Sequence, residues 1–285
     1  MLGARPRTLP AAVVPVVVGT AAAVGGSGDG IVWWRFGAAL VVALAIQIAT
    51  NYVNDYSDGI RGTDDRRVGP TRLVASRLAT ASEVRLAAGL SALVAGVAGL
   101  ALAVAVGPEV LVVGIACFAA GYLYTGGPRP YGYYGLGEAF VFVFFGVVAT
   151  VGSAYVQLDR ITPLEVGASI PVGILATALL VVNNLRDIPT DAVSGKRTLA
   201  VRLGDGATRV MYVALVIGAL LALPLLSLPR PWALLAALSL PAAVRPIRAI
   251  ASGATGMSLI AVLVDTARLQ LVFGTLLALG LALSG

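Results

Sequence analysis

Long apolar stretches recur along the whole sequence, and each is close to the ~20 residues that an α-helix needs to cross a lipid bilayer. They do not show the alternation of apolar and polar residues that marks the strands of a membrane β-barrel. Only 12% of the residues are charged, whereas soluble domains have about 25%. The predicted helices span residues 9–26, 36–53, 84–106, 109–126, 135–157, 163–183, 209–228, 232–248 and 266–284. The sequence therefore predicts an all-α fold, a single multi-pass transmembrane bundle of about nine helices within residues 1–285.

Two residue types that often carry chemistry are almost missing. The sequence has no histidine, and its single cysteine, Cys117, lies inside an apolar stretch. The lack of histidine excludes a Ser-His-Asp triad and the commonest metal ligand. One cysteine excludes an intrachain disulfide and a thiolate metal site within the chain. Any chemistry must use carboxylates, Lys, Arg, Tyr, Asn or the backbone.

The basic residues indicate how the chain is oriented. The net charge is +6, but the Lys and Arg residues lie in the connections between apolar stretches, so topology explains them better than a nucleic-acid partner. Only Arg35, Arg160 and Arg230 fall on the side with short connections, and the long connections 54–83 and 184–208 fall on the other side. The positive-inside rule therefore places the N-terminus and the long connections in the cytoplasm, on the inner face of the plasma membrane.

The first acidic motif follows the second apolar stretch and begins "NYVNDYSDG". Asn51, Asp55 and Asp58 are spaced four and three residues apart, so they share one face of a helix. We expect the helix to end near Gly59 or Gly62, with Asp64 beyond it. A carboxylate at membrane depth costs about 2.5–3.5 kcal/mol on insertion scales, so these groups require a compensating partner.

The second acidic motif, "NNLRDIPTDAVSGKR", follows the sixth apolar stretch. Asn183, Asp187 and Asp191 repeat the oxygen-rich spacing of the first motif. Pro189 cannot donate a backbone hydrogen bond and disfavours a helical residue before it. We therefore expect Asp187 to end one helix and Asp191 to lie on a new turn.

The two motifs suggest an internal repeat. The same 132-residue offset relates Asn51 to Asn183 and Asp55 to Asp187. In both places the pair ends an apolar stretch and opens a long connection. This pattern predicts two four-helix pseudo-repeats plus one further helix.

Asp and Asn oxygens near basic residues, without His or Cys, suit a diphosphate bound through Mg²⁺. Arg186, Lys196 and Arg197 lie beside the second motif and can neutralise phosphate charge. The membrane setting suggests that the diphosphate carries a long apolar tail, as in a polyprenyl diphosphate. Solvated loop charge is the alternative, and it is the better explanation for Asp64 and Asp65.

A third motif, "YLYTGGPRPYGYYGLGE", follows the fourth apolar stretch. Tyr122 and Tyr124 are candidates for stabilising a carbocation with the negative faces of their rings. The alternative is an interfacial aromatic belt, which is common in membrane proteins. Arg129 is a candidate phosphate or carboxylate contact or a topological anchor, and Glu138 is unusual because it lies just inside an apolar stretch.

These motifs resemble the UbiA superfamily of intramembrane aromatic prenyltransferases over nearly the whole chain. The likeness rests on "NDYSDGIRGTDD", "YTGGPRPYGYYGLGE" and "NNLRDIPTDAVSGKRTLAVRLG", with support from the opening "ARPRTLPAAVVPVVVGT". The combination is most similar to the branch that prenylates 1,4-dihydroxy-2-naphthoate on the route to demethylmenaquinone and menaquinone. One departure is that the third acid of the first motif is displaced from position 62, which is glycine, to Asp64.

The resemblance implies a Mg²⁺-dependent reaction between a polyprenyl diphosphate and dihydroxynaphthoate, with loss of CO₂ and diphosphate. It implies two Mg²⁺ ions, one bound by Asp55 and Asp58 and the other by Asp187 and Asp191, with Asp64 as a further candidate. It also implies contacts from the amide groups of the two motif asparagines and from a set of basic residues to the diphosphate. These residues are Asn51, Asn183, Arg61, Arg186, Lys196 and Arg197. Another aromatic or quinone acceptor is the alternative.

Three other classes of membrane protein compete with this interpretation. A secondary transporter also places acids inside the membrane, but near its middle rather than at the ends of helices. A CDP-alcohol phosphotransferase also uses Mg²⁺, but "DGIRGTDD" lacks its Ala-Arg pair and that class leaves the second motif unexplained. A purely structural membrane protein leaves the Asn and Asp spacing unexplained.

Overall fold

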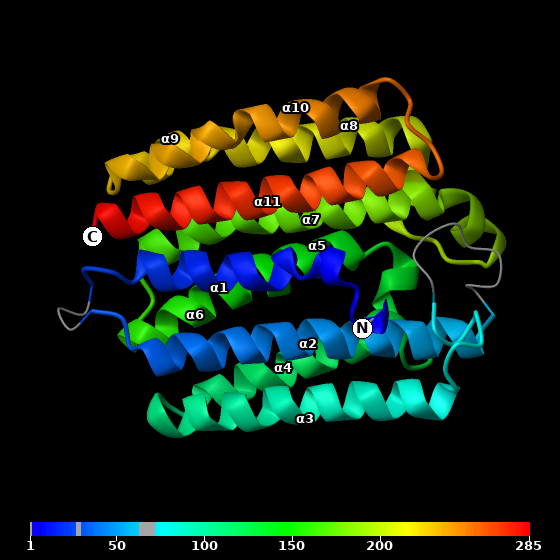
Figure 1. Ribbon diagram of the computed structural model, residues 1–285, viewed down its shortest axis with the longest axis horizontal. Coiled ribbons are helices and arrows are strands. Elements are labelled where there is room, and N and C mark those ends of the chain that lie inside the picture. The colour runs from blue at the N-terminus through cyan, green and yellow to red at the C-terminus, as the bar shows by residue number, and fades with distance from the viewer. Residues whose placement is uncertain (1, 27–29, 63–71) are drawn as a thin grey trace.

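The computed structural model describes residues 2–26, 30–62 and 72–285, and within these ranges every regular element is a helix. The helices lie lengthwise beside one another in an elongated bundle (Figure 1). The α-helices are α1 (Pro10–Ala22), α2 (Trp33–Ile60), α3 (Ala81–Ala105), α4 (Glu109–Thr125), α5 (Gly137–Val141), α6 (Ala149–Leu158), α7 (Pro163–Val193), α8 (Leu199–Leu221), α9 (Leu223–Ser227), α10 (Leu240–Ala251) and α11 (Ser258–Leu283). Short 3-10 turns cover Leu2–Ala4, Pro6–Thr8 and Tyr131–Tyr134, a longer one covers Pro231–Ser239, and a π-helix covers Phe142–Val148.

Several of these elements join end to end, so that the described ranges contain seven helices long and apolar enough to cross a membrane and two shorter apolar ones. The joined spans are Gly137–Leu158, Leu199–Ser227 and Pro231–Ala251, and the shorter helices are Pro6–Ala22 and Glu109–Thr125. The predicted all-α bundle of about nine helices is confirmed. Its length and composition are those of a multi-pass membrane protein.

Two of the long helices begin with a capping box that is visible in the sequence. Thr80 precedes α3 and receives a hydrogen bond from the backbone N–H of Glu83, while the Glu83 carboxylate accepts the N–H of Thr80 at 2.7 Å. Thr162 and Glu165 make the same reciprocal contacts at the start of α7. These contacts satisfy backbone donors that a helix leaves unpaired at its first turn, which fixes both starting points.

The main core lies around α7, which is the most enclosed of the long helices. It packs against α8 and α11, and α1 packs between α11 and α6 (Figure 1). Buried side chains on these helices include Val172, Leu175, Tyr212 and Phe273. The helices α2, α3 and α4 form the other side of the bundle, against α1 and α6.

One helix contact is closer than any side chain would permit. A Cβ added to Gly146, in the π-helix, would lie 2.3 Å from the Cα of Gly173 in α7. The two glycines therefore let the backbones touch, as small residues do at membrane helix interfaces. This contact fixes the π-helix against the central helix of the bundle.

Among the expected helix boundaries, two near the second acidic motif were wrong. Pro189 does not interrupt the helix, because α7 runs on to Val193 and carries both Asp187 and Asp191. Pro189 is exposed one turn before the helix ends, where a missing hydrogen bond and the proline ring are easily accommodated. The next helix also begins earlier than its apolar pattern predicts, because the Thr198 side chain caps α8 and Leu199 starts it.

Candidate active site

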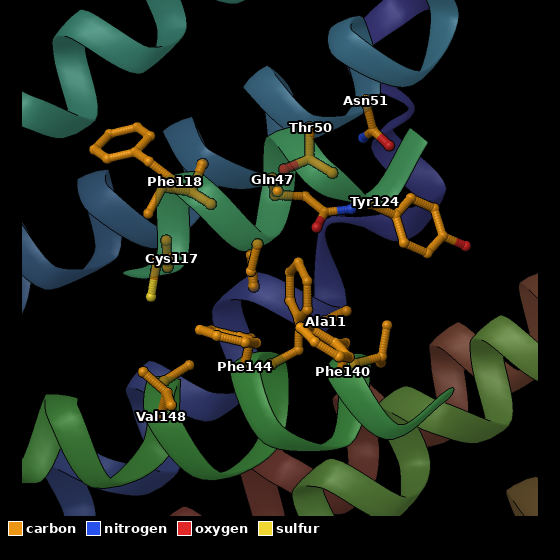
Figure 2. Close-up of a pocket in the computed structure, with 18 of the residues that line it drawn as sticks. Ala11, Gln47, Thr50, Asn51, Cys117, Phe118, Tyr124, Phe140, Phe144 and Val148 are labelled. Carbon is orange, nitrogen blue, oxygen red and sulfur yellow. The ribbon is translucent and has the colours of Figure 1, made fainter. Parts of the chain in front are cut away.

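A cavity of about 390 Å³ lies inside the bundle, with walls formed by α1, α2, α3, α4, the π-helix and α7. One end is lined by charged side chains, among them Asp58 and Lys196. The rest is lined mainly by apolar and aromatic side chains such as Phe140, Phe144 and Val148 (Figure 2). The lining includes Asp58 and Ala39 of α2. Their separation along the helix axis is about 28 Å at 1.5 Å per residue. The cavity therefore joins a polar end to an apolar channel nearly as long as a bilayer is thick.

The apolar part of the cavity reaches the outside of the bundle. Leu100, Leu111 and Ile115 line it and are also exposed on the outer surface, Ile115 to 69%. These residues belong to the apolar helices α3 and α4 and lie on the outer surface of the bundle. An apolar chain could therefore lie partly in the cavity and partly in the bilayer.

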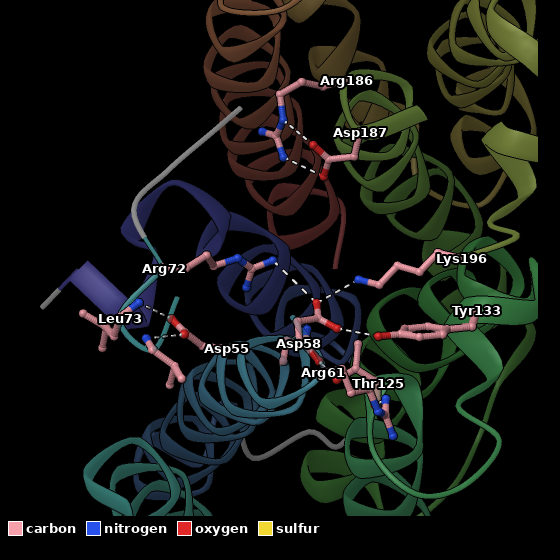
Figure 3. A network of polar contacts seen from close by, with 12 residues as sticks. Asp55, Asp58, Arg61, Arg72, Leu73, Thr125, Tyr133, Arg186, Asp187 and Lys196 are labelled. Atoms are coloured by element: carbon pink, nitrogen blue, oxygen red, sulfur yellow. Dashed lines mark hydrogen bonds and ion pairs between the residues drawn. The ribbon is translucent and has the colours of Figure 1, made fainter. Parts of the chain in front are cut away.

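Asp58 is the centre of the polar end. It is 2% exposed, and its Oδ1 accepts the hydroxyl of Tyr133 at 2.7 Å. Its Oδ2 accepts a hydrogen bond from the ammonium group of Lys196 at 2.9 Å and lies 3.9 Å from a guanidinium nitrogen of Arg72 (Figure 3). Asp58 and Lys196 are 138 residues apart in the sequence, so this ion pair joins the first acidic motif to the second.

The acids of the second motif face the same cavity. Asp187 and Asp191 both line it, together with Asn183 one turn earlier on α7. The carboxylate of Asp187 pairs with the guanidinium of Arg186 through two hydrogen bonds of 2.8 and 2.9 Å. The predicted convergence of the two motifs at one end of the bundle is thus present in the structure, from the C-terminal ends of α2 and α7 (Figure 1).

Asp55 has a different environment from the other predicted acids. It is fully buried, and its two oxygens accept the backbone N–H groups of Leu73 at 2.9 Å and Val74 at 3.1 Å. It does not line the cavity. These contacts hold the segment that carries Arg72, so Asp55 orders one wall of the polar end. Asp64 lies outside the described residues.

Asn51 lines the cavity one turn below Asp55 on α2. Its amide donates to the backbone carbonyl of Ala4 at 3.1 Å and to the Thr8 hydroxyl at 3.3 Å. Thr8 also accepts the amide of Gln47 at 3.0 Å. The N-terminal segment is therefore attached to α2 and closes one side of the cavity.

The predicted cations occupy different positions. Lys196 lines the cavity, whereas Arg61, Arg129, Arg186 and Arg197 do not. Arg61 donates to the backbone carbonyls of Thr125 and Gly127, the second at 2.6 Å. Arg129 and Arg197 are exposed.

Several polar residues of the cavity were not predicted from the sequence, and two of these, Arg72 and Asn54, lie close to predicted ones. Arg72 lines the cavity and pairs with Asp58, and Asn54 lines it and accepts the Thr125 hydroxyl at 2.7 Å. Asn54 belongs to the quoted first motif and could have been found there. Arg72 lies in a connection, and no regular spacing identified it among the neighbouring arginines.

The two tyrosines proposed for carbocation contact differ in position. Tyr124 lines the cavity, and Tyr122 is 56% exposed on the outer surface. Tyr124 meets Tyr131 edge to face, with ring centroids 5.5 Å apart. Tyr131 in turn stacks on Phe140, with ring centroids 3.9 Å apart, and Phe140 stacks on Phe144, with ring centroids 5.9 Å apart.

These four rings form a continuous aromatic wall along the cavity, and Figure 2 shows three of them around the open space. The Tyr131 hydroxyl donates to the carbonyl of Ala120 at 2.8 Å, and burial raises the pKa of Tyr131, so the phenol stays neutral. Phe144 lies in the π-helix Phe142–Val148. π-Helical turns are rare and are frequently found at functional sites, which agrees with the position of this one beside the cavity.

Glu138 lies behind the cavity wall rather than in it. It is 6% exposed, and its Oε1 accepts the amide of Asn184 at 2.9 Å. Its other oxygen has no hydrogen-bond partner within the described part of the chain. Asn184 does line the cavity, so Glu138 orients a polar group of the wall.

The oxygen ligands at the polar end fit Mg²⁺ that is shared with a phosphate. Within the ranges given above, no three His, Cys, Asp or Glu side chains are grouped closely enough to hold a metal ion by themselves. Mg²⁺ sites in phosphate-binding enzymes commonly use one or two carboxylates and complete the shell with phosphate oxygens and water. Asp58, Asp187 and Asp191 supply carboxylates of this kind on one cavity, and Lys196 and Arg72 supply positive charge.

The fold is a helical bundle of membrane length, and its apolar cavity has acids and cations at its mouth. These features define a class of integral membrane protein that holds a lipid with an anionic head. Comparison with known proteins identifies the family within this class. The chain belongs to the UbiA prenyltransferase family, whose sequence profile matches residues 12–252.

The relatives cover nearly the whole chain. A Mycobacterium tuberculosis protein described as 1,4-dihydroxy-2-naphthoate octaprenyltransferase is 49% identical over 280 residues, which are 98% of this chain and 95% of that protein. An Escherichia coli protein with the same description is 36% identical and covers 98% of this chain and 94% of its own length. A solved structure of a UbiA homolog from Archaeoglobus fulgidus bound to GPP and Mg²⁺ has a TM-score of 0.65 over 97% of this chain and 98% of that one. At 14% identity, this last likeness shows the fold alone.

Proposed function

We propose that this protein transfers a polyprenyl chain from polyprenyl diphosphate to 1,4-dihydroxy-2-naphthoate. The observation that carries the proposal is the cavity in which Asp58, Asp187, Asp191 and Lys196 lie at one end of an apolar channel. The acceptor is proposed from the description shared by the Mycobacterium tuberculosis and Escherichia coli relatives.

The diphosphate head would lie at the polar end of the cavity. Lys196 and Arg72 would neutralise phosphate oxygens, and Asp58, Asp187 and Asp191 would hold Mg²⁺ together with the diphosphate. When bound, Mg²⁺ supplies positive charge that stabilises the departing diphosphate. The amides of Asn51 and Asn183 lie on the same cavity and would complete the polar contacts to this head group.

The remaining predicted residues would act from outside the cavity. Asp55 would hold the Arg72 segment in place, and its proposed role as a metal ligand would require it to leave the amides of Leu73 and Val74. Arg186 would hold the Asp187 carboxylate, and Arg61 would support the loop after α4. Arg197 would contact a diphosphate only after a change of side-chain conformation, since it is exposed here.

The apolar part of the cavity would hold the chain and the allylic cation that forms when the carbon–oxygen bond to diphosphate breaks. The faces of Tyr124 and its aromatic neighbours would stabilise positive charge while the walls exclude water. The electron-rich ring of the acceptor then forms the new carbon–carbon bond. Loss of its carboxylate as CO₂ returns a bonding pair to the ring, so the net substitution needs no protein base and gives the reduced form of demethylmenaquinone.

The orientation follows from the basic residues. The polar end of the cavity lies at the end of the bundle that carries the long, Arg-rich connections, and the C-terminus lies at the opposite end (Figure 1). Through the positive-inside rule, this arrangement supports the proposal that the polar end faces the cytoplasm at the plasma membrane.

The test is a reaction with purified protein, Mg²⁺, a polyprenyl diphosphate and a panel of aromatic acceptors. We expect a decarboxylated, prenylated product from 1,4-dihydroxy-2-naphthoate and none from 4-hydroxybenzoate, detected by chromatography and mass spectrometry of the lipid extract. Product from 4-hydroxybenzoate instead would identify a prenyltransferase with another acceptor. Failure with every acceptor and every chain length would reject the proposal.

A further inference from the structure

Tyr133 is the residue that connects most of the polar groups at the end of the cavity. It belongs to the short turn Tyr131–Tyr134, in the connection between α4 and α5, and it lines the cavity. Its hydroxyl, its ring and its backbone each make a separate contact with the acidic motifs. In the sequence, Tyr133 is only one of several tyrosines in the motif "YLYTGGPRPYGYYGLGE".

The first contact is between the hydroxyl group of Tyr133 and the carboxylate of Asp58. The phenol donates to Oδ1 at 2.7 Å, while Lys196 donates to Oδ2 at 2.9 Å (Figure 3). One donor on each oxygen fixes the rotation of the carboxylate plane. Each carboxylate oxygen has about two lone-pair sites, so an oxygen that accepts a hydrogen bond can also bind a metal ion.

The second contact is between the aromatic ring of Tyr133 and two cationic side chains. The ammonium nitrogen of Lys196 lies 4.8 Å from the ring centroid of Tyr133, and the guanidinium carbon of Arg61 lies 5.5 Å from it. Both distances are within the ~6 Å range of a cation–π interaction. The ring therefore holds the Lys196 side chain at the edge of the cavity.

The backbone contact joins the same turn to the second motif. The N–H of Arg197 donates to the carbonyl of Tyr133 at 3.0 Å. The loop after α4 and the loop after α7 are thus held together beside the end of α2. Three segments that are distant in the sequence meet at this one residue.

We infer that Tyr133 is a positioning residue that orients Asp58 for Mg²⁺ through its hydroxyl and Lys196 for the diphosphate through its ring. The inference rests on the proposed function. Hydrogen-bond partners of metal ligands typically contribute 10- to 100-fold to metal affinity or activity. One cation–π contact corresponds to about a 2- to 5-fold change in affinity.

Two substitutions separate these contributions. Tyr133→Phe removes the hydroxyl and keeps the ring, and Tyr133→Leu removes both. The matched control is Tyr134→Phe, because Tyr134 is the next residue, is 52% exposed and does not line the cavity. The readout is equilibrium binding of Mn²⁺, followed by electron paramagnetic resonance, to purified full-length protein with and without inorganic diphosphate. Thermal unfolding without metal reports whether each variant is folded.

We expect Tyr133→Phe to weaken diphosphate-dependent Mn²⁺ binding about 10- to 100-fold, while the affinity for diphosphate in the absence of metal changes less than about 2-fold. We expect Tyr133→Leu to weaken Mn²⁺ binding equally and to lower the affinity for diphosphate a further 2- to 5-fold. Tyr134→Phe should match the wild type in both. In the prenyl-transfer assay, Tyr133→Phe should require correspondingly more Mg²⁺ for half-maximal turnover.

Equal Mn²⁺ affinity in Tyr133→Phe and the wild type, with the wild type binding Mn²⁺ only when diphosphate is present, would overturn the role of Tyr133 and leave the proposed function intact. A wild-type protein that binds no Mn²⁺ with diphosphate would overturn both. A variant that lowers only the unfolding temperature, with unchanged metal and diphosphate binding, would show that the tyrosine is merely structural.

Discussion

The substitution Asp58→Asn tests the central contact of the site with almost no change in shape. The wild-type carboxylate is 2% exposed and faces Lys196 at 2.9 Å and Arg72 at 3.9 Å. The amide keeps one oxygen that can accept from Tyr133 or Lys196, but it removes the negative charge from between the two cations. It also removes one of the carboxylates proposed to hold Mg²⁺.

The expected loss can be estimated in two parts. Removing a preorganised electrostatic group that acts on a developing charge typically lowers turnover about 10²- to 10³-fold, or roughly 2.7–4 kcal/mol. Losing one charge-assisted hydrogen bond in a buried setting costs about 1.5–3 kcal/mol of folding stability. We therefore expect a folded variant with turnover reduced at least 100-fold.

The assay measures prenylated product from purified protein at saturating substrates over a range of Mg²⁺ concentrations, with circular dichroism to follow thermal unfolding. The control is Asp159→Asn, because Asp159 has a side chain that is 58% exposed and pairs with Arg35 at the opposite end of the bundle. Turnover in Asp58→Asn above about a tenth of the wild-type value, with an unchanged Mg²⁺ dependence, would refute the reasoning.

Three other results are expected. Asp55→Ala should lower the free energy of unfolding by about 2–4 kcal/mol, measured by thermal unfolding, because two partly buried N–H groups, those of Leu73 and Val74, lose their acceptor; an unchanged unfolding temperature would contradict this. Gly146→Ala should destabilise the protein by about 1–3 kcal/mol or more through the clash with Gly173, without changing the Mg²⁺ dependence of turnover. Removal of divalent metal with EDTA should stop prenyl transfer, and added Mg²⁺ should restore it; turnover that persists in EDTA would exclude a divalent metal.

The sequence was sufficient to predict the fold class and the meeting of the two acidic motifs. Apolar stretches of membrane length leave a helical bundle as the only way to satisfy the backbone without a barrel. Asp58 and Asp187 each follow such a stretch on the side with long connections, so the motifs had to share one end of the bundle. The convergence therefore required no knowledge of side-chain conformations.

Hydropathy was a poorer guide where charged residues lie inside a helix. The start of α8 was predicted as a connection because Arg202 and Asp205 lower the hydropathy of its first turns. A residue in the left-handed region, Gly204 with φ 78°, interrupts the helix there and further obscures the period. Thr198 is a residue type that often caps a helix. Without an apolar stretch directly after it, however, such a residue is only a weak signal for the start of a helix.

The partners of individual side chains were beyond prediction. Asp55 and Asp58 are three residues apart and have the same sequence environment, yet one accepts two backbone amides and the other accepts Tyr133 and Lys196. Tyr133 is 75 residues from Asp58, so only the folded arrangement of the loops reveals their contact. Spacing in the sequence identifies which side chains lie near one another, but not which atoms form hydrogen bonds or ion pairs.

The π-helix Phe142–Val148 has a consequence for how the length of this segment can vary. An α-helix advances about 100° for each residue, so deletion of one residue at 149–152, in the regular helix that follows, would rotate everything after it by roughly that angle relative to Phe140. Ser153 would then turn away from the cavity, and Gln157 would lose the backbone amide of Val32, which it now accepts at 2.9 Å. Within the π-helix, by contrast, loss of one residue would close the wide turn into an α-helix and leave the following residues in place. We therefore expect a one-residue deletion to be tolerated in these seven residues but not at 149–152.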